Sequence, residues 1–151
     1  MYIDFTSEQY SFILHALTIM ITFYSNDFSS ICKEVGEAYG ASEADIASAC
    51  ATLTAINVTA PVKSYSDKCS DILEDMLHHA RELPEKDAPY KYSIGLDASS
   101  WKVVADALDT YSRILMGQFG VIYEALDISG NDEQHFQAYH DARWGGGPRS
   151  P

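Results

Sequence analysis

Apolar residues recur at the spacing of an α-helix along most of this chain, and this pattern limits the folds that it can adopt. The pattern is most complete between residues 92 and 126. There, the extended run 92–96 precedes Asp97, whose carboxylate can cap a helix by accepting hydrogen bonds from its first turn. Gly117 then interrupts the helical spacing, as glycine does where a helix ends or kinks. The stretch predicts a strand and a capped helix, followed by a second helix or by a kinked continuation.

Two apolar lines run along this predicted helix. The wider line consists of Trp101, Val104, Ala105, Leu108, Ile114 and Leu115, and the narrower one of Val103, Ala107 and Tyr111.

The N-terminal residues repeat this plan at an offset of 91 positions. At that offset Ile3 aligns with Ile94, and Thr6, a second capping residue, aligns with Asp97. The agreement favours an internal duplication of a strand and helical hairpin, with halves 1–83 and 92–144, although a search over all offsets also produces coincidences.

Thr6 and Gln9 form a capping-box pattern for a first helix that extends to about Tyr24. This helix is apolar on two sides: one line runs from Tyr10 to Tyr24, and the other contains Phe12, Ala16, Ile19 and Phe23. Such a helix lies either at the centre of a fold or in a subunit interface. The second interpretation leads us to expect a homo-oligomer.

The following segment predicts three more helices and their connections. The first is expected over 28–39, capped by Asn26 or Asp27 and ended by Gly40. The second begins at Ser42 with Asp45 and is followed by a loop over 57–65. The third is capped by Ser66 or Asp67 and stopped by Leu83-Pro84.

The polar, proline-containing segment 84–91 is the best candidate for a stiff linker between the halves. A last amphipathic helix is expected from Asp132, and the glycine- and proline-rich residues 145–151 predict a flexible tail. The sequence therefore predicts a mainly α fold: one helical bundle over residues 1–144, with a short β element of two strands left open.

Composition restricts the partners. With 22 acidic and 10 basic residues, the formal net charge is −12, which repels nucleic-acid phosphates and anionic membrane surfaces. We therefore expect no direct nucleic-acid binding and no membrane association. The most apolar run, 12–24, is too short to span a bilayer, no cationic signal peptide is evident, and the three cysteines form no metal-binding pattern. These features predict a cytoplasmic protein.

No nucleophile, phosphate-binding or metalloprotease motif occurs in the chain, so we expect neither an enzyme nor a cofactor. The pairs Glu74/His78 and Asp75/His79 have the i,i+4 spacing that could hold a metal ion, but solvated helix pairs are the more common outcome. His135 and His140, five positions apart, are weaker candidates still.

The most distinctive cluster lies at 111–118. Tyr111 could stack on a ligand, Arg113 could bind an anion through two hydrogen bonds, and Gln118 could offer an amide, with Met116 between them. The alternative is that Arg113 pairs with Asp106 or Asp109 and stabilises the helix.

The segment 107–119, which contains Tyr-Ser-Arg-Ile-Leu-Met-Gly-Gln, resembles a motif of small uncharacterised proteins of tailed phages and bacteria. The resemblance implies a phage or mobile-element origin, and hence the cytoplasm of a host cell. Small acidic phage proteins often act on host factors, including as inhibitors of defence systems.

Three functions remain open on the sequence. The leading hypothesis is a non-catalytic protein that blocks or sequesters a host protein, as a counter-defence inhibitor. The second is a sponge for a small nucleotide signal, bound near Arg113. The third is a metal-dependent hydrolase, which no group of residues favours.

Overall fold

The computed structural model describes residues 1–55, 60–118, 122 and 125–126. The elements of this part, in chain order, are β1 (Tyr2–Thr6), α1 (Ser7–Tyr24), α2 (Ser29–Ala38), α3 (Glu43–Thr54), α4 (Ala60–His79), β2 (Arg81–Glu82), the 3₁₀ helix η1 (Glu85–Asp87), β3 (Tyr90–Gly95) and α5 (Ala98–Leu115). The fold is mainly α with a small sheet, as predicted.

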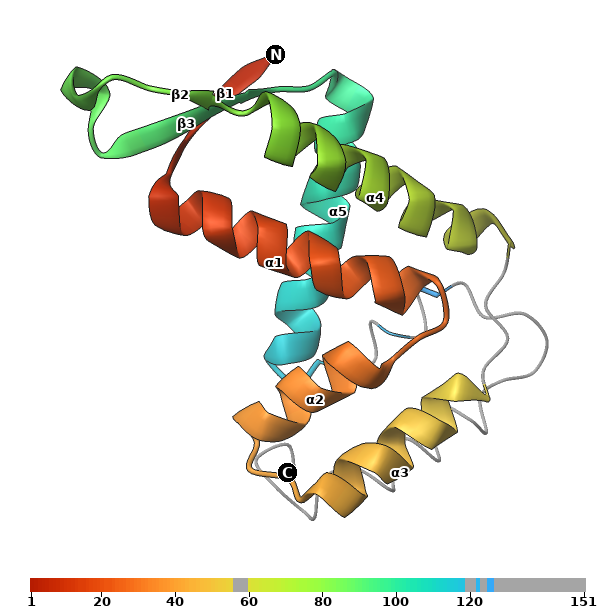
Figure 1. The fold of residues 1–151 in the computed structure, drawn as a ribbon. Helices are drawn as coiled ribbons and strands as arrows, with labels where there is room; N and C mark the ends of the chain where they lie inside the picture. Colours follow the sequence, from red (N-terminus) through yellow and green to blue (C-terminus); the bar gives the residue numbers. More distant parts are fainter. Residues whose placement is uncertain (56–59, 119–121, 123–124, 127–151) are drawn as a thin grey trace.

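The sheet lies at one end of the molecule and α2 and α3 at the other, with α1, α4 and α5 between them (Figure 1). Helix α1 packs against α2, α4 and α5. Side chains from both of its predicted apolar lines are buried, among them Leu17, Met20 and Phe23. The central position of α1 within one chain therefore accounts for its two apolar sides, except for Phe12, which is 45% exposed.

The sheet has three strands rather than two, in the order β1-β3-β2, and both pairings are antiparallel. The additional strand, β2, pairs Arg81 with Ser93 and Glu82 with Tyr92. The predicted stop of the preceding helix at Leu83-Pro84 is consequently wrong, because α4 ends at His79 and the chain joins the sheet. The segment 84–91, predicted as a linker, contains η1 and connects β2 to β3.

Helix α4 also begins earlier than predicted. Residues 60–65 belong to it, although Pro61 favoured a loop over 57–65. Proline is tolerated in the first turn of a helix, where its missing N–H would have no intrahelical acceptor. Ser66 and Asp67 are therefore not capping residues; the Ser66 hydroxyl instead donates to the carbonyl of Ile21 at 2.7 Å and joins α4 to α1.

Several local predictions are confirmed. Thr6 and Gln9 form the reciprocal capping box, and Ser42 accepts a hydrogen bond from the Asp45 amide at 3.1 Å. Gly40, with a positive φ of 71°, follows the end of α2. The cap of α2 differs from the prediction. Phe28 occupies the N-cap position without a side-chain hydrogen bond, while Asp27 accepts from the Ser29 amide.

Helix α5 ends at Leu115, before Gly117, and does not continue through that residue as a kinked helix. Gly117 has a φ of 85°, and the amide of Gln118 donates to the carbonyl of Arg113 at 3.0 Å, which is a glycine-based helix end. The buried side of α5 combines the two predicted lines: Val104, Ala107, Tyr111 and Ile114 are buried, whereas Ala105 is exposed. The predicted last helix, the tail and His135 and His140 lie outside the described residues.

The offset of 91 positions also relates the observed elements. Helix α5 both begins and ends 91 residues after α1, and Ile3 pairs directly with Ile94 in the sheet. The two strand–helix units therefore meet along their strands.

Asp97 caps α5 by accepting from the Ser100 amide at 2.7 Å. This hydrogen bond, and then those from the side chains of Ser99 and Ser100, lower the pKa of the Asp97 carboxyl. A lowered folded-state pKa means that the charged group stabilises the fold above its ordinary pKa and loses this effect as the pH falls through the lowered value.

We therefore expect acidification from about pH 5 to about pH 2 to reduce the Tm of the wild type more than that of Asp97→Asn, because asparagine caps a helix without a charge. Thermal denaturation followed by circular dichroism measures the Tm of the wild type and of the variant at each pH in this range. A constant difference between the two Tm values would contradict the prediction.

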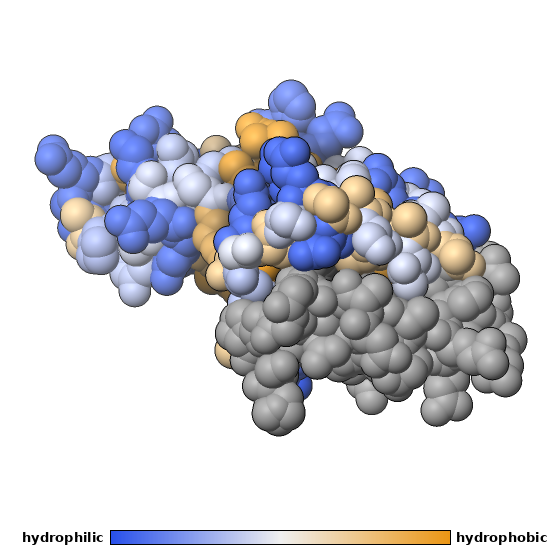
Figure 2. Space-filling model, turned by 90° about the horizontal axis from the view of Figure 1, so that it is seen from below, coloured by the Kyte–Doolittle hydropathy of each residue, from blue (hydrophilic) through white to orange (hydrophobic). Residues whose placement is uncertain are grey.

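Figure 2 shows the molecule from the end formed by α2 and α3. The coloured part of this face is largely hydrophilic, and its hydrophobic residues form small separate groups.

Candidate functional site

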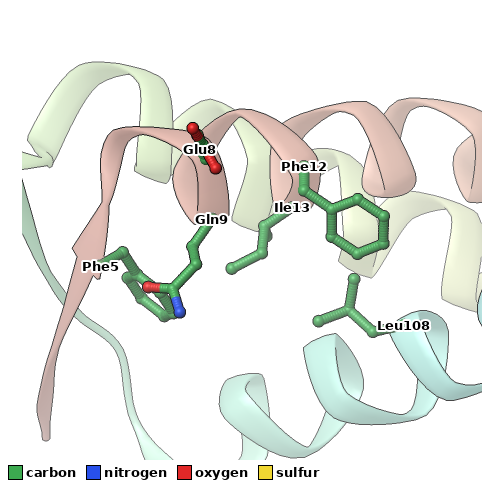
Figure 3. Close-up of a pocket in the computed structure, with 6 residues that line it drawn as sticks. All are labelled: Phe5, Glu8, Gln9, Phe12, Ile13 and Leu108. Atoms are coloured by element: carbon green, nitrogen blue, oxygen red, sulfur yellow. The ribbon is translucent and has the colours of Figure 1, made fainter.

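An apolar groove opens between the end of β1, the first half of α1 and the middle of α5 (Figure 3). Its volume is about 380 Å³. The lining residues are Phe5, Glu8, Gln9, Phe12, Ile13 and Leu108. Four of these six side chains are apolar, so the groove offers a hydrophobic floor with a polar rim.

The capping box determines the near end of this groove. Thr6 Oγ1 accepts from the Gln9 amide at 3.1 Å, and Gln9 Oε1 accepts from the Thr6 amide at 2.9 Å. These two bonds satisfy amides at the start of α1 that have no intrahelical acceptor, and they hold the junction between β1 and α1. The Phe5 ring is supported from α5 by Trp101, at a centroid distance of 5.9 Å.

Phe12 is the most exposed of the large apolar side chains in the groove, at 45%. In Figure 3 its ring lies above Leu108, across the groove from α1 to α5. Helical spacing places Phe12 near Gln9 and Ile13 on the same side of α1. An exposed aromatic ring beside an apolar hollow is typical of a surface that binds another molecule.

The Phe12 ring packs near a cluster formed by Tyr111, Glu34 and His15. The Phe12 ring lies 5.9 Å from the ring of Tyr111, whose hydroxyl donates to Glu34 Oε1 at 2.8 Å. His15 Nε2 lies 3.0 Å from the same oxygen. Burial, and then the hydrogen bond to Glu34, raise the pKa of Tyr111, so its hydroxyl stays protonated and remains a donor. The cluster joins α1, α2 and α5 behind the groove.

Glu34 is not fully satisfied in this cluster. Its second oxygen, Oε2, is buried and has no hydrogen-bond partner. The hydrogen bonds to Oε1 therefore compensate for only part of the cost of burying this carboxylate.

The four residues predicted to bind a ligand do not line the groove. Tyr111 is buried in the core, whereas Arg113 is exposed, and its Nε donates to both carboxylate oxygens of Asp109, at 3.0 and 3.1 Å. The alternative pairing of Arg113 is thus confirmed for Asp109. Met116 and Gln118 are exposed at the end of α5.

The predicted i,i+4 pairs lie together near the end of α4. Glu74, Asp75, His78 and His79 line an open depression of about 490 Å³, and Asp75 Oδ1 lies 3.7 Å from His79 Nε2. In the part of the chain that the structure describes, however, no three His, Cys, Asp or Glu residues are grouped so that they could hold a metal ion.

Two of the three cysteine thiols, those of Cys32 and Cys69, offer little nucleophilic chemistry. Cys32 and Cys69 are buried, and all three cysteines are free. Burial raises the pKa of the Cys69 thiol to about 11 and also raises that of Cys32. A raised thiol pKa reduces the fraction of reactive thiolate near neutral pH.

Sequence reasoning did not identify the groove. The one signal in the sequence is the second apolar line of α1, which contains Phe12. The core of the fold does not bury this side chain. Phe5 lies in strand β1 and Leu108 in helix α5, and nothing in the spacing of these residues indicates that they meet.

Comparisons of the chain with protein-family models, with curated proteins and with solved structures gave no match. Among the described residues, no helix is long and apolar enough to cross a membrane.

Proposed function

We propose that this protein is a non-catalytic binding module that holds a segment of another protein in the groove between β1, α1 and α5. The observation that carries the proposal is the exposed Phe12 ring beside an apolar hollow built from three elements. Aromatic side chains in apolar hollows often supply most of the binding energy of protein interfaces. The groove needs no titratable catalytic group to perform this role.

The resemblance of residues 107–119 to phage proteins supports a host protein as the partner. Occupation of the groove would then block or sequester that host protein, as a counter-defence inhibitor does. The net charge of −12 favours a basic partner surface, since opposite charge accelerates association and disfavours wrong partners.

A nucleotide sponge near Arg113 is less well supported. Its guanidinium group already pairs with Asp109, and Tyr111 directs its hydroxyl to Glu34. The carboxylate of Asp109 reduces the attraction of Arg113 for an anion, and the buried Tyr111 offers no exposed ring on which a base could stack.

The Phe12→Ala variant tests the proposed function. A display library of random linear peptides is selected against the wild-type protein, and the affinity of the best synthetic peptide is then measured by calorimetry. We expect Phe12→Ala to weaken binding at least about tenfold, which corresponds to roughly 1.4 kcal/mol.

Leu77→Ala is the matched control, because Leu77 is 56% exposed but lies on α4, away from the groove. It should bind the peptide as the wild type does. Equal affinity of the wild type and Phe12→Ala, or a selection that yields no peptide, would contradict the proposed function.

A further inference from the structure

The outer edge of the sheet lies beside the groove. Strand β1 is at the edge of the order β1-β3-β2, so in the described part of the chain one side of its backbone has no neighbouring strand. Met1 and Tyr2 are 71% and 68% exposed, and Ile3 is 37% exposed, so this edge is accessible. Unpaired edges of this kind are templates for an additional strand.

The hydrogen bonds to β3 show which backbone groups are unpaired. The Met1 amine donates to the Leu96 carbonyl at 3.2 Å, and the Leu96 amide donates to the Met1 carbonyl at 3.1 Å. Pairs that exchange two such bonds alternate with pairs that exchange none in an antiparallel ladder. The continuous register from Tyr2 to Phe5 therefore directs the N–H and C=O groups of Tyr2 and Asp4 toward the free edge.

This edge is continuous with the groove. Strand β1 ends in Phe5 and Thr6, and Phe5 is itself a lining residue. Figure 3 shows β1 leading directly into the helix that carries Glu8, Gln9 and Phe12. A chain paired with β1 is thus adjacent to the apolar floor.

The charges at this edge indicate what kind of chain fits it. Asp4 and Glu8 are exposed, and within the described residues no hydrogen bond or ion pair is made by either carboxylate. If a second copy paired through the same edge, both Asp4 side chains would lie on one face of the joined sheet, in molecules that each carry a net charge of −12. Basic residues in the bound segment would instead complement these carboxylates.

We propose that the partner segment binds in an extended conformation as a fourth strand on β1. It forms hydrogen bonds with the backbone of Tyr2 and Asp4, places an apolar side chain against Phe5 and Phe12, and carries basic residues that complement Asp4 and Glu8. Backbone hydrogen bonds supply affinity in this mode of recognition, and the groove supplies specificity. This inference rests on the proposed function and specifies its partner.

Two substitutions of one residue test the inference with the selected synthetic peptide. Asp4→Asn removes the charge and keeps the outward N–H, whereas Asp4→Pro removes both. Proline is tolerated on an edge strand where the lost N–H does not face the neighbouring strand. We expect Asp4→Asn to weaken binding a few-fold in low salt, and Asp4→Pro to weaken it by a further factor of about ten.

Hydrogen exchange on the wild type provides a second measurement that requires no substitution. Bound peptide should slow exchange of the Tyr2 and Asp4 amides. Unchanged exchange of both amides, or equal affinities of Asp4→Pro and Asp4→Asn, would overturn the added strand, even if Phe12→Ala still loses binding. If neither Phe12→Ala nor Asp4→Pro loses affinity for the peptide, the proposed function is contradicted as well. A dimer in light scattering that Asp4→Pro dissociates would identify a second copy as the occupant instead.

Discussion

Replacement of Phe23 by alanine is expected to reduce the free energy of unfolding by about 3–5 kcal/mol. Phe23 is fully buried in α1, and its ring makes edge-to-face contacts with Tyr24 and Phe28, at centroid distances of 5.5 and 5.6 Å. The variant loses the transfer free energy of the ring and leaves a cavity between α1 and α2. Such a loss is a large part of the roughly 5–15 kcal/mol that stabilises an ordinary domain.

Urea denaturation followed by circular dichroism measures this change as a shift of the denaturation midpoint, provided that the dependence of the unfolding free energy on urea concentration is the same in both proteins. Phe12→Ala is the matched control, since it makes the same substitution on the same helix at a side chain that is 45% exposed. Its cost should be much smaller. Equal losses in the two variants would show that Phe23 does not hold the core together.

Tyr111→Phe is expected to cost about 1.5–3 kcal/mol, the range for hydrogen bonds to charged groups. The substitution keeps the buried ring and removes the donor to Glu34, whose other oxygen already has no partner. The side chain of Glu34 is 27% exposed, so solvent compensates in part and the lower end of the range applies.

A double-mutant cycle separates the hydrogen bond from other effects. Glu34→Leu alone leaves the Tyr111 hydroxyl buried without an acceptor, whereas the combination with Tyr111→Phe removes both polar partners. We expect the double variant to be more stable than the sum of the single losses predicts. Additive losses would mean that the 2.8 Å contact between these two side chains contributes no coupling.

The parts of the fold that were predictable depend on local chemistry. The capping residues Thr6, Ser42 and Asp97 each act within three positions of the residue that they bind, so a single window of sequence contains the whole interaction. The positive φ of Gly40 and Gly117 has the same local character.

The sequence-based predictions were wrong or incomplete where local signals conflict, or where residues distant in sequence determine the structure. Pro61 reads as a loop residue, although it is compatible with the first turn of α4. Strand β2 has two residues, too few to show a period, and exists because β3 offers it a partner. The groove likewise depends on Phe12 meeting Leu108, a relation between helices that no spacing rule encodes.

The pairing of β1 with β3 has a consequence for the order in which the chain folds during synthesis. The first strand joins a partner at residues 90–95, so it stays without its neighbour until most of the described chain has left the ribosome. Contacts so distant in sequence slow folding, because a long loop must close before they form. We expect helices α1 to α4, which precede β3 in the chain, to form earlier and the pairing of β1 with β3 to be a late step.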